Sequence, residues 1–141
     1  MGFNDLEGTI PNFTSLKNLQ ILTIGANQLT GTLPNFSNLP LLMSLVLHTN
    51  QLTGSIPNFI KLPYLSTLHL NNNQLIGSIP NFSHLPHLSV LSLHHNKLTG
   101  EVPTSLKSLS LSQLLLNNNQ LSGKIPDFTN IRRFQIFQNQ F

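Results

Sequence analysis

Leucine and isoleucine alternate with polar residues in short stretches that recur at a fixed interval along the chain. Within one unit, residues 42–57, the pattern is L-x-x-L-x-L-x-x-N-x-L-x-G-x-I-P. The period-two alternation around Leu45 and Leu47 predicts a short strand with both leucines facing inward. Equivalent pairs follow the same 23-residue step: Leu22-Ile24, Leu68-Leu70, Leu91-Leu93 and Leu114-Leu116. Strands so far apart in sequence cannot form hairpins, so we expect one strand per 23-residue coil, stacked in a parallel sheet.

The residues that end each strand and turn the chain keep the same step. One asparagine, one glycine and one proline recur in each unit: Asn27, Asn50, Asn73, Asn96 and Asn119; Gly8, Gly31, Gly54, Gly77, Gly100 and Gly123; Pro11, Pro34, Pro57, Pro80, Pro103 and Pro126. We expect the asparagine amides to bond the turn backbone in a buried ladder. After most of these prolines, Asn-Phe predicts a cap that opens a short helical turn. The phenylalanines should stack inside the outer wall: Phe13, Phe36, Phe59, Phe82 and Phe128.

This repeat divides the whole chain into one array. We expect a partial coil over 1–11, an irregular final coil over 127–141, and five full coils between them: 12–34, 35–57, 58–80, 81–103 and 104–126. The fifth full coil has Ser105 where the others carry phenylalanine. The final coil fits the pattern only if about three residues are deleted.

The repeated motif resembles the leucine-rich repeat superfamily, in its plant-specific class, and is similar also to plant-like repeats of bacterial surface proteins. The resemblance implies a parallel-β solenoid: a curved right-handed superhelix with a concave parallel sheet and a convex side of short helical turns and loops. It also implies an extracellular or cell-surface recognition module, because members bind proteins, peptides and glycans.

The composition of the chain argues against several other classes of protein. Only 8% of the 141 residues are charged and the net charge is +3, so the basic stripe of a nucleic-acid binder is missing. No apolar run is long enough to span a membrane, and the first residues do not form a signal peptide. With no cysteine, disulfides and thiol chemistry are excluded.

Side chains on the outward face of the predicted sheet are the candidate ligand-binding residues. In the five regular coils this face has no formal charge and is rich in histidine, asparagine, serine and threonine, which suits hydrogen bonding to a protein or glycan. The candidates are Val46, His48, Thr49, His69, Asn71, Asn72, Ser92, His94, His95 and Asn117. Ordinary solvent-facing strand positions would have similar composition, and the sequence leaves both interpretations open.

The histidines on this face raise two further hypotheses. His48, His69 and His94 lie diagonally on adjacent strands, about 8 Å apart at strand spacing. A pH-sensitive patch is the favoured hypothesis. A metal site is not expected, because no carboxylate lies nearby to orient the imidazoles, and no cofactor is expected.

Catalysis is not expected. The acidic residues are Asp5, Glu7, Glu101 and Asp127. No two of them occupy neighbouring positions on one face, and none lies on the concave sheet, so neither a carboxylate pair nor a Ser-His-acid set can form.

The residues around each glycine suggest a different functional class, that of ice-binding proteins. Threonines such as Thr30, Thr53 and Thr99 recur at strand spacing and resemble the rows of ice-binding solenoids, although Ile76, Glu101 and Lys124 interrupt them. Three further positions form N-glycosylation sequons: Asn12, Asn35 and Asn81.

Apolar residues at both ends suggest a third alternative, a filament built by head-to-tail self-association. Those at the front are Met1, Phe3, Leu6 and Ile10, and those at the back are Ile131, Phe134, Ile136, Phe137 and Phe141. The sequence therefore predicts a non-catalytic recognition or structural module, with self-assembly and ice binding as the alternatives.

Overall fold

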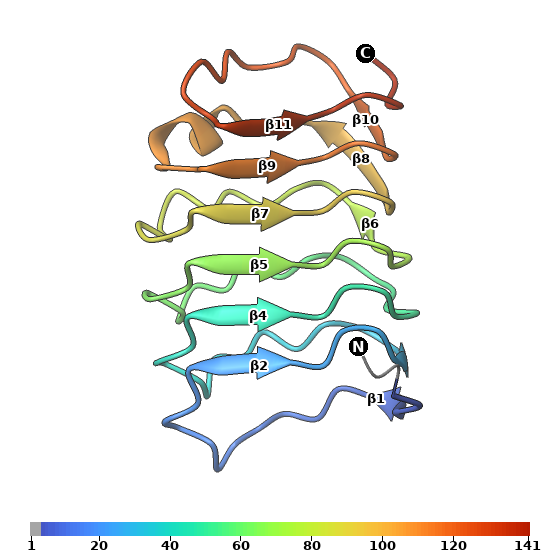
Figure 1. The fold of residues 1–141 in the computed structure, drawn as a ribbon, viewed down its shortest axis with the longest axis vertical. Helices are drawn as coiled ribbons and strands as arrows, with labels where there is room; N and C mark the ends of the chain where they lie inside the picture. The colour runs from blue at the N-terminus through green and yellow to red at the C-terminus, as the bar shows by residue number, and fades with distance from the viewer. Residues whose placement is uncertain (1–3) are drawn as a thin grey trace.

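The computed structural model describes residues 4–141 as a solenoid built around one parallel sheet (Figure 1). Its six strands lie in the order β11-β9-β7-β5-β4-β2. Their bounds are β2 Ile21–Thr23, β4 Ser44–Val46, β5 Thr67–His69, β7 Val90–Ser92, β9 Gln113–Leu115 and β11 Arg133–Gln135. Leu45 pairs with Leu68, and Leu68 with Leu91, so each coil adds one strand in the predicted register.

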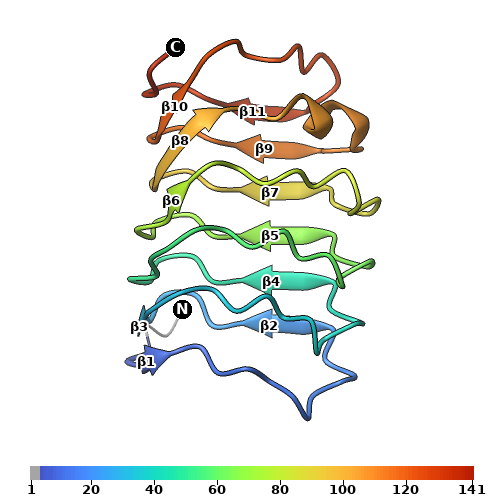
Figure 2. The ribbon, with the colours of Figure 1, turned by 180° about the vertical axis from the view of Figure 1, so that it is seen from behind.

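A second set of short parallel strands runs along the flank where each coil turns (Figure 2). β1 (Glu7–Thr9) pairs with β3 (Gln28–Thr30), while β6 (Ile76–Gly77), β8 (Lys97–Glu101) and β10 (Gln120–Ser122) form a three-stranded sheet. These flank strands were not predicted, because the glycine and proline of each coil indicated turns alone. The alternation Gln-Leu-Thr could have indicated these strands. In β3 its leucine is buried and both neighbours are exposed.

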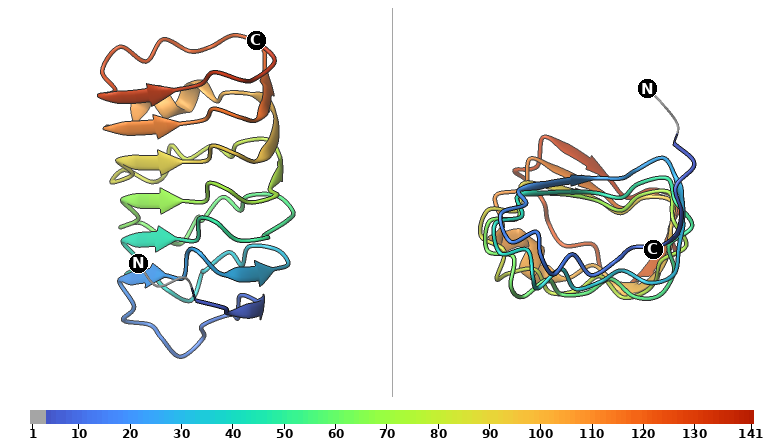
Figure 3. Two further views of the ribbon diagram at one scale, coloured as in Figure 1. Left: turned by 45° about the vertical axis from the view of Figure 1, so that its right-hand side comes forward. Right: turned by 90° about the horizontal axis from the view of Figure 1, so that it is seen from below.

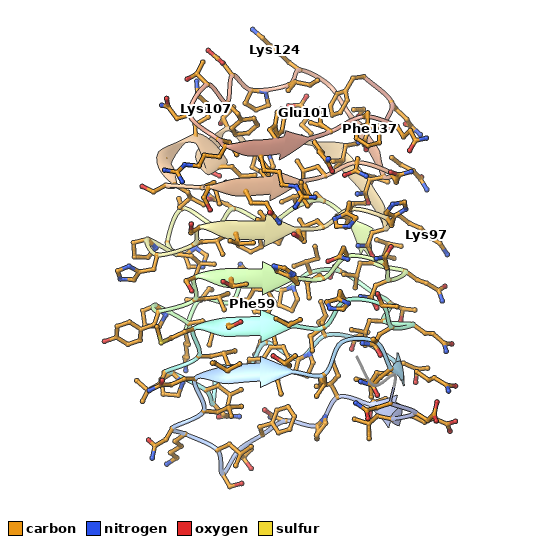
Figure 4. All side chains as sticks on the ribbon, in the orientation of Figure 1. Phe59, Lys97, Glu101, Lys107, Lys124 and Phe137 are labelled. Carbon is orange, nitrogen blue, oxygen red and sulfur yellow. The ribbon has the colours of Figure 1, made fainter. Side chains whose placement is uncertain are left out.

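Leucines from both sets of strands meet inside the coils, which superimpose when seen along the solenoid axis (Figure 3). Phe36, Phe59 and Phe82 are at most 1% exposed. The rings of Phe36 and Phe59 are tilted, with centroids 6.2 Å apart, and those of Phe59 and Phe82 are stacked at 6.3 Å, which confirms an aromatic row across the central coils. Phe59 lies behind the main sheet in Figure 4. The ends differ, since Phe13 is only half-buried and Phe128 packs on Phe134 at 5.2 Å.

A helical turn was predicted where Asn-Phe follows the proline, but within residues 4–141 the structure has a helical turn in a different coil. This is η1, a 3-10 helix over Thr104–Ser108, in the coil that lacks the phenylalanine. In two other coils Phe36 and Phe59 adopt φ 51°, a left-handed backbone that stops a helix from continuing. The asparagine still caps the turn there, because Asn35 Oδ1 accepts the Ser37 N–H at 3.0 Å.

The asparagine ladder is confirmed. Asn73 Oδ1 accepts the Leu52 N–H at 3.0 Å, and its Nδ2 donates to the carbonyls of Leu47 and Leu70 at 3.1 Å. The same three bonds, two to the preceding coil and one within the coil, recur at Asn50, Asn96, Asn119 and Asn139. The backbone N–H and C=O groups at the ends of the strands therefore have hydrogen-bond partners in these asparagine side chains.

The final coil is three residues shorter than the others, as predicted. Arg133 of β11 pairs with Gln113 of β9, 20 positions earlier instead of 23. The shortened path leaves a hollow of about 620 Å³ on the convex side, between residues 106–112 and 127–132.

The apolar residues predicted to be exposed at the ends of the array are not all exposed. Ile10 is buried, contrary to prediction, because its side chain joins the core cluster with the following coil. Leu6, Phe137 and Phe141 are exposed. Met1 and Phe3 lie outside the described residues. No helix in the described part of the chain has the length and apolar content needed to cross a membrane.

Candidate functional site

The face of the main sheet that points away from the core has the predicted columns of side chains. Val46, His69 and Ser92 are direct partners across β4, β5 and β7. The next column is aligned by backbone bonds beyond the strands, since the Asn72 N–H donates to the His94 carbonyl at 3.0 Å. Thr49, Asn72 and His95 follow at φ 56°, 54° and 54°, where the chain turns sharply out of the sheet.

Several predicted ligand residues are not exposed on this face. Ser92 is 1% and Asn117 4% exposed. Gln113 covers Ser92 and donates to its Oγ at 3.1 Å, while Asn117 Nδ2 donates to Asn118 Oδ1 at 2.7 Å. Asn71 is also buried, whereas Val46, His48, His69 and His94 are half-buried and Thr49, Asn72 and His95 are exposed. Solvent exposure of all of these side chains was expected, and it is not found at Ser92, Asn71 and Asn117; Ser92 and Asn117 instead bond neighbouring polar side chains.

Seven of the predicted residues meet around a hollow of about 420 Å³ on this face: His48, Thr49, His69, Asn71, Asn72, Ser92 and His94. Val46, His95 and Asn117 do not line it. Gln113, Leu115 and Arg133 do, although sequence analysis did not select them. Arg133 belongs to the irregular final coil. The sequence feature that could have identified Arg133 is its positive charge, since the equivalent outward positions of the other strands are neutral.

The four imidazoles on this face lie in two pairs. The ring centroids of His48 and His69 are 6.5 Å apart, and those of His94 and His95 are 5.4 Å apart and edge to face. Burial lowers the pKa of His69, and the charge of His48 lowers it further. Burial also lowers the pKa of His94, with added repulsion from His95, Arg133, His69 and His48. Both imidazoles are therefore neutral at physiological pH.

Two polar atoms at this site have no hydrogen-bond partner. His94 Nδ1 and Asn117 Oδ1 are both buried and unbonded. Neither atom is exposed, so neither is open to a ligand on this face as the side chains stand. Among residues 4–141, no three histidine or acidic side chains lie close enough together to hold a metal ion.

We expect the stability of the fold to fall as pH drops below about 6.5, the ordinary pKa of histidine. His69 and His94 have lowered pKa values in the folded state, so the unfolded chain binds more protons in that range. The Tm measured by circular dichroism should decrease between about pH 7.5 and 5.5. The double variant His69→Gln/His94→Gln should show a smaller decrease, and an equal decrease would contradict this assignment.

The other predicted sites lie elsewhere on the surface. Asn35 and Asn81 are exposed and cap local turns, while Asn12 Oδ1 accepts Asn38 Nδ2 at 2.8 Å. Thr30, Thr53 and Thr99 are exposed along the flank strands, and Ile76, 50% exposed, interrupts that row. Glycosylation and ice binding stay predictions.

Comparison with known proteins gives one consistent result. Two models of the leucine-rich repeat match residues 63–121 and 110–140. The ectodomain of the Arabidopsis thaliana receptor kinase SOBIR1 has a TM-score of 0.77 and is 36% identical, with 84% of this chain matching 71% of that one. Curated protein sequences give no match.

Two longer structures superimpose more closely. The plant peptide hormone receptor RGFR1, solved in complex with RGF2, gives a TM-score of 0.92 at 34% identity over 96% of this chain. The Arabidopsis receptor kinase HAESA, solved with the peptide hormone IDA and the co-receptor SERK1, gives 0.90 at 37% identity over 96%. The chain spans 23% and 24% of those two structures, respectively. With its repeat, its solenoid and these relatives, the chain belongs to the leucine-rich repeat family, in its plant type.

Proposed function

We propose that this chain is a non-catalytic recognition module that binds a peptide or protein on the outward face of its main sheet, outside the cell. The observation that carries the proposal is the hollow on this face, which is lined by His48, His69, Asn72 and His94. Peptide ligands accompany RGFR1 and HAESA in their structures, and both ectodomains share this solenoid. Residues 1–141 form, in this proposal, one continuous array of leucine-rich repeats.

A peptide fits this face better than an extended flat partner. The hollow of about 420 Å³ can accept one or two side chains, and the exposed amide of Asn72 can pair with a peptide backbone. A non-catalytic role agrees with the positions of the acids. Asp5 bonds the Gln28 side chain and Glu101 lies in the flank strand β8, both away from the histidines.

The proposal is tested by selecting binders from a random peptide library displayed on phage. A synthesised binder should lose at least tenfold in affinity for the double variant His69→Ala/Asn72→Ala, as measured by isothermal titration calorimetry. The matched control is Thr53→Ala/Gln51→Ala, which removes two exposed side chains from the flank. If no peptide is selected, or if the flank variant alone loses binding, this function is wrong.

A further inference from the structure

The hollow on the main sheet is positively charged and has no acidic residue to balance it. Arg133 enters it from β11, and His48, His69 and His94 enter from three neighbouring coils, with His95 against His94. These five are the titratable or charged groups of the described residues on this face. The four acids lie elsewhere: Asp5, Glu7 and Glu101 on or near the flank strands and Asp127 at the convex hollow.

Arg133 has no acid near enough to form an ion pair within residues 4–141, because those carboxylates belong to other surfaces. Its side chain is exposed at the rim of the hollow. Gln113 beside it already donates to Ser92 Oγ. The guanidinium is therefore the one fixed positive charge on this rim among the described residues, and its planar fork of N–H groups matches a carboxylate.

The histidines can add charge to the same place. Burial and mutual repulsion lower the pKa of His69 and His94, so both are neutral without a ligand at neutral pH. An anion placed between them and Arg133 would oppose that repulsion and favour the protonated rings. The rings of His69 and His94 line the hollow and are only half-buried, so a proton gained by either ring would lie near a ligand oxygen.

We propose that this hollow receives an acidic side chain of a peptide ligand, held by Arg133 and the surrounding imidazoles, and that binding strengthens as pH falls from about 7.5 to 5.5. The inference rests on the proposed peptide-binding function and adds the charge of the ligand and its coupling to protons. Because a bound carboxylate raises the affinity of the histidines for protons, linkage requires that protonation raise the affinity for the carboxylate.

The experiment uses the same random peptide library, selected separately at about pH 5.5 and pH 7.5. Peptides recovered at the lower pH should be enriched in Asp and Glu. One of them, synthesised with an amidated C-terminus, should bind at least tenfold more weakly at pH 7.5. Its copy with Gln in place of Glu and Asn in place of Asp should bind at least tenfold more weakly at pH 5.5 and lose most of the pH dependence. Amidation removes the terminal carboxylate, so the effect is assigned to side chains.

Arg133→Gln and Arg132→Gln provide a matched pair of variants. Each removes one positive charge from the final coil, but Arg132 lines the convex hollow instead. Arg133→Gln should weaken the acidic peptide about tenfold at pH 5.5, the scale of one charge-assisted hydrogen bond, and Arg132→Gln should weaken it less than twofold. Heteronuclear NMR spectra of both variants check that the fold is retained.

The outcomes separate this inference from the function on which it rests. Selected peptides without acidic enrichment that still depend on His69 and Asn72 would leave the peptide-binding function standing and overturn the acidic ligand. Equal weakening by Arg133→Gln and Arg132→Gln would indicate general electrostatic attraction and would overturn the hollow as the site. A library that yields no binder at either pH overturns both.

Discussion

Replacing Phe59 by alanine should lower the free energy of unfolding by about 3–5 kcal/mol, the range for removing a buried aromatic ring. Phe59 is 1% exposed and lies between two other rings, with centroids 6.2 Å from Phe36 and 6.3 Å from Phe82. Its removal would leave a cavity in the middle of the array, where coils on both sides hold the backbone in place. Urea denaturation followed by far-ultraviolet circular dichroism measures the change.

The neighbouring residue supplies the control. Ile60 is 72% exposed, so Ile60→Ala should change the free energy of unfolding by no more than about 0.5 kcal/mol. Phe59→Leu should fall between the two alanine variants, because it keeps part of the buried volume. If Phe59→Ala costs as little as Ile60→Ala, the aromatic stack is not a major source of stability.

Asn73→Ala should cost about 1–3 kcal/mol, chiefly by leaving one buried N–H without a partner. Asn73 Oδ1 is the side-chain acceptor for the Leu52 N–H. The carbonyls of Leu47 and Leu70 lose one donor each but keep another, from Asn50 and Asn96. Because each carbonyl keeps a second donor, the Leu52 N–H is the main group that loses its partner. Thermal and urea unfolding of the variant measure the loss.

Two further variants identify the cause of that loss. Asn58→Ala alters an exposed asparagine of the same coil and should change stability by no more than about 0.5 kcal/mol. Asn73→Asp keeps the acceptor for Leu52 but points a carboxylate at two carbonyls, so it should destabilise more at pH 7 than at about pH 4. Equal stability of Asn73→Ala and Asn58→Ala would refute the role assigned to the ladder.

Periodicity was enough to predict the main sheet and its core. A leucine pair every 23 residues can be buried only if each coil places a strand in the same register, which the Leu45–Leu68–Leu91 alignment confirms. The asparagine ladder followed for the same reason, since an amide at a fixed offset always meets the same backbone groups in the next coil. Even the shortened final coil could be read from the spacing of Asn119 and Asn139.

Local conformation was harder to predict, because it depends on backbone angles that side-chain pattern does not specify. The sequence favours a helical turn after each Asn-Phe, yet Phe36 and Phe59 take a left-handed φ that places their rings in the core. The helical turn forms instead at Thr104–Ser108, where no phenylalanine must be buried. The flank strands were missed because two or three paired residues produce little periodicity.

The sequence by itself determined the family, the parallel stacking of the coils, and which residues occupy the outward columns of the sheet. All of these follow from a repeat whose apolar side chains have one common way to be buried. Only the tertiary structure decided which outward residues a ligand can reach. Ser92 and Asn117 are covered by polar neighbours, whereas Arg133 reaches the hollow because a coil three residues short still brings its strand into line. Those contacts join side chains of different coils, so their geometry depends on packing that the repeat pattern does not encode.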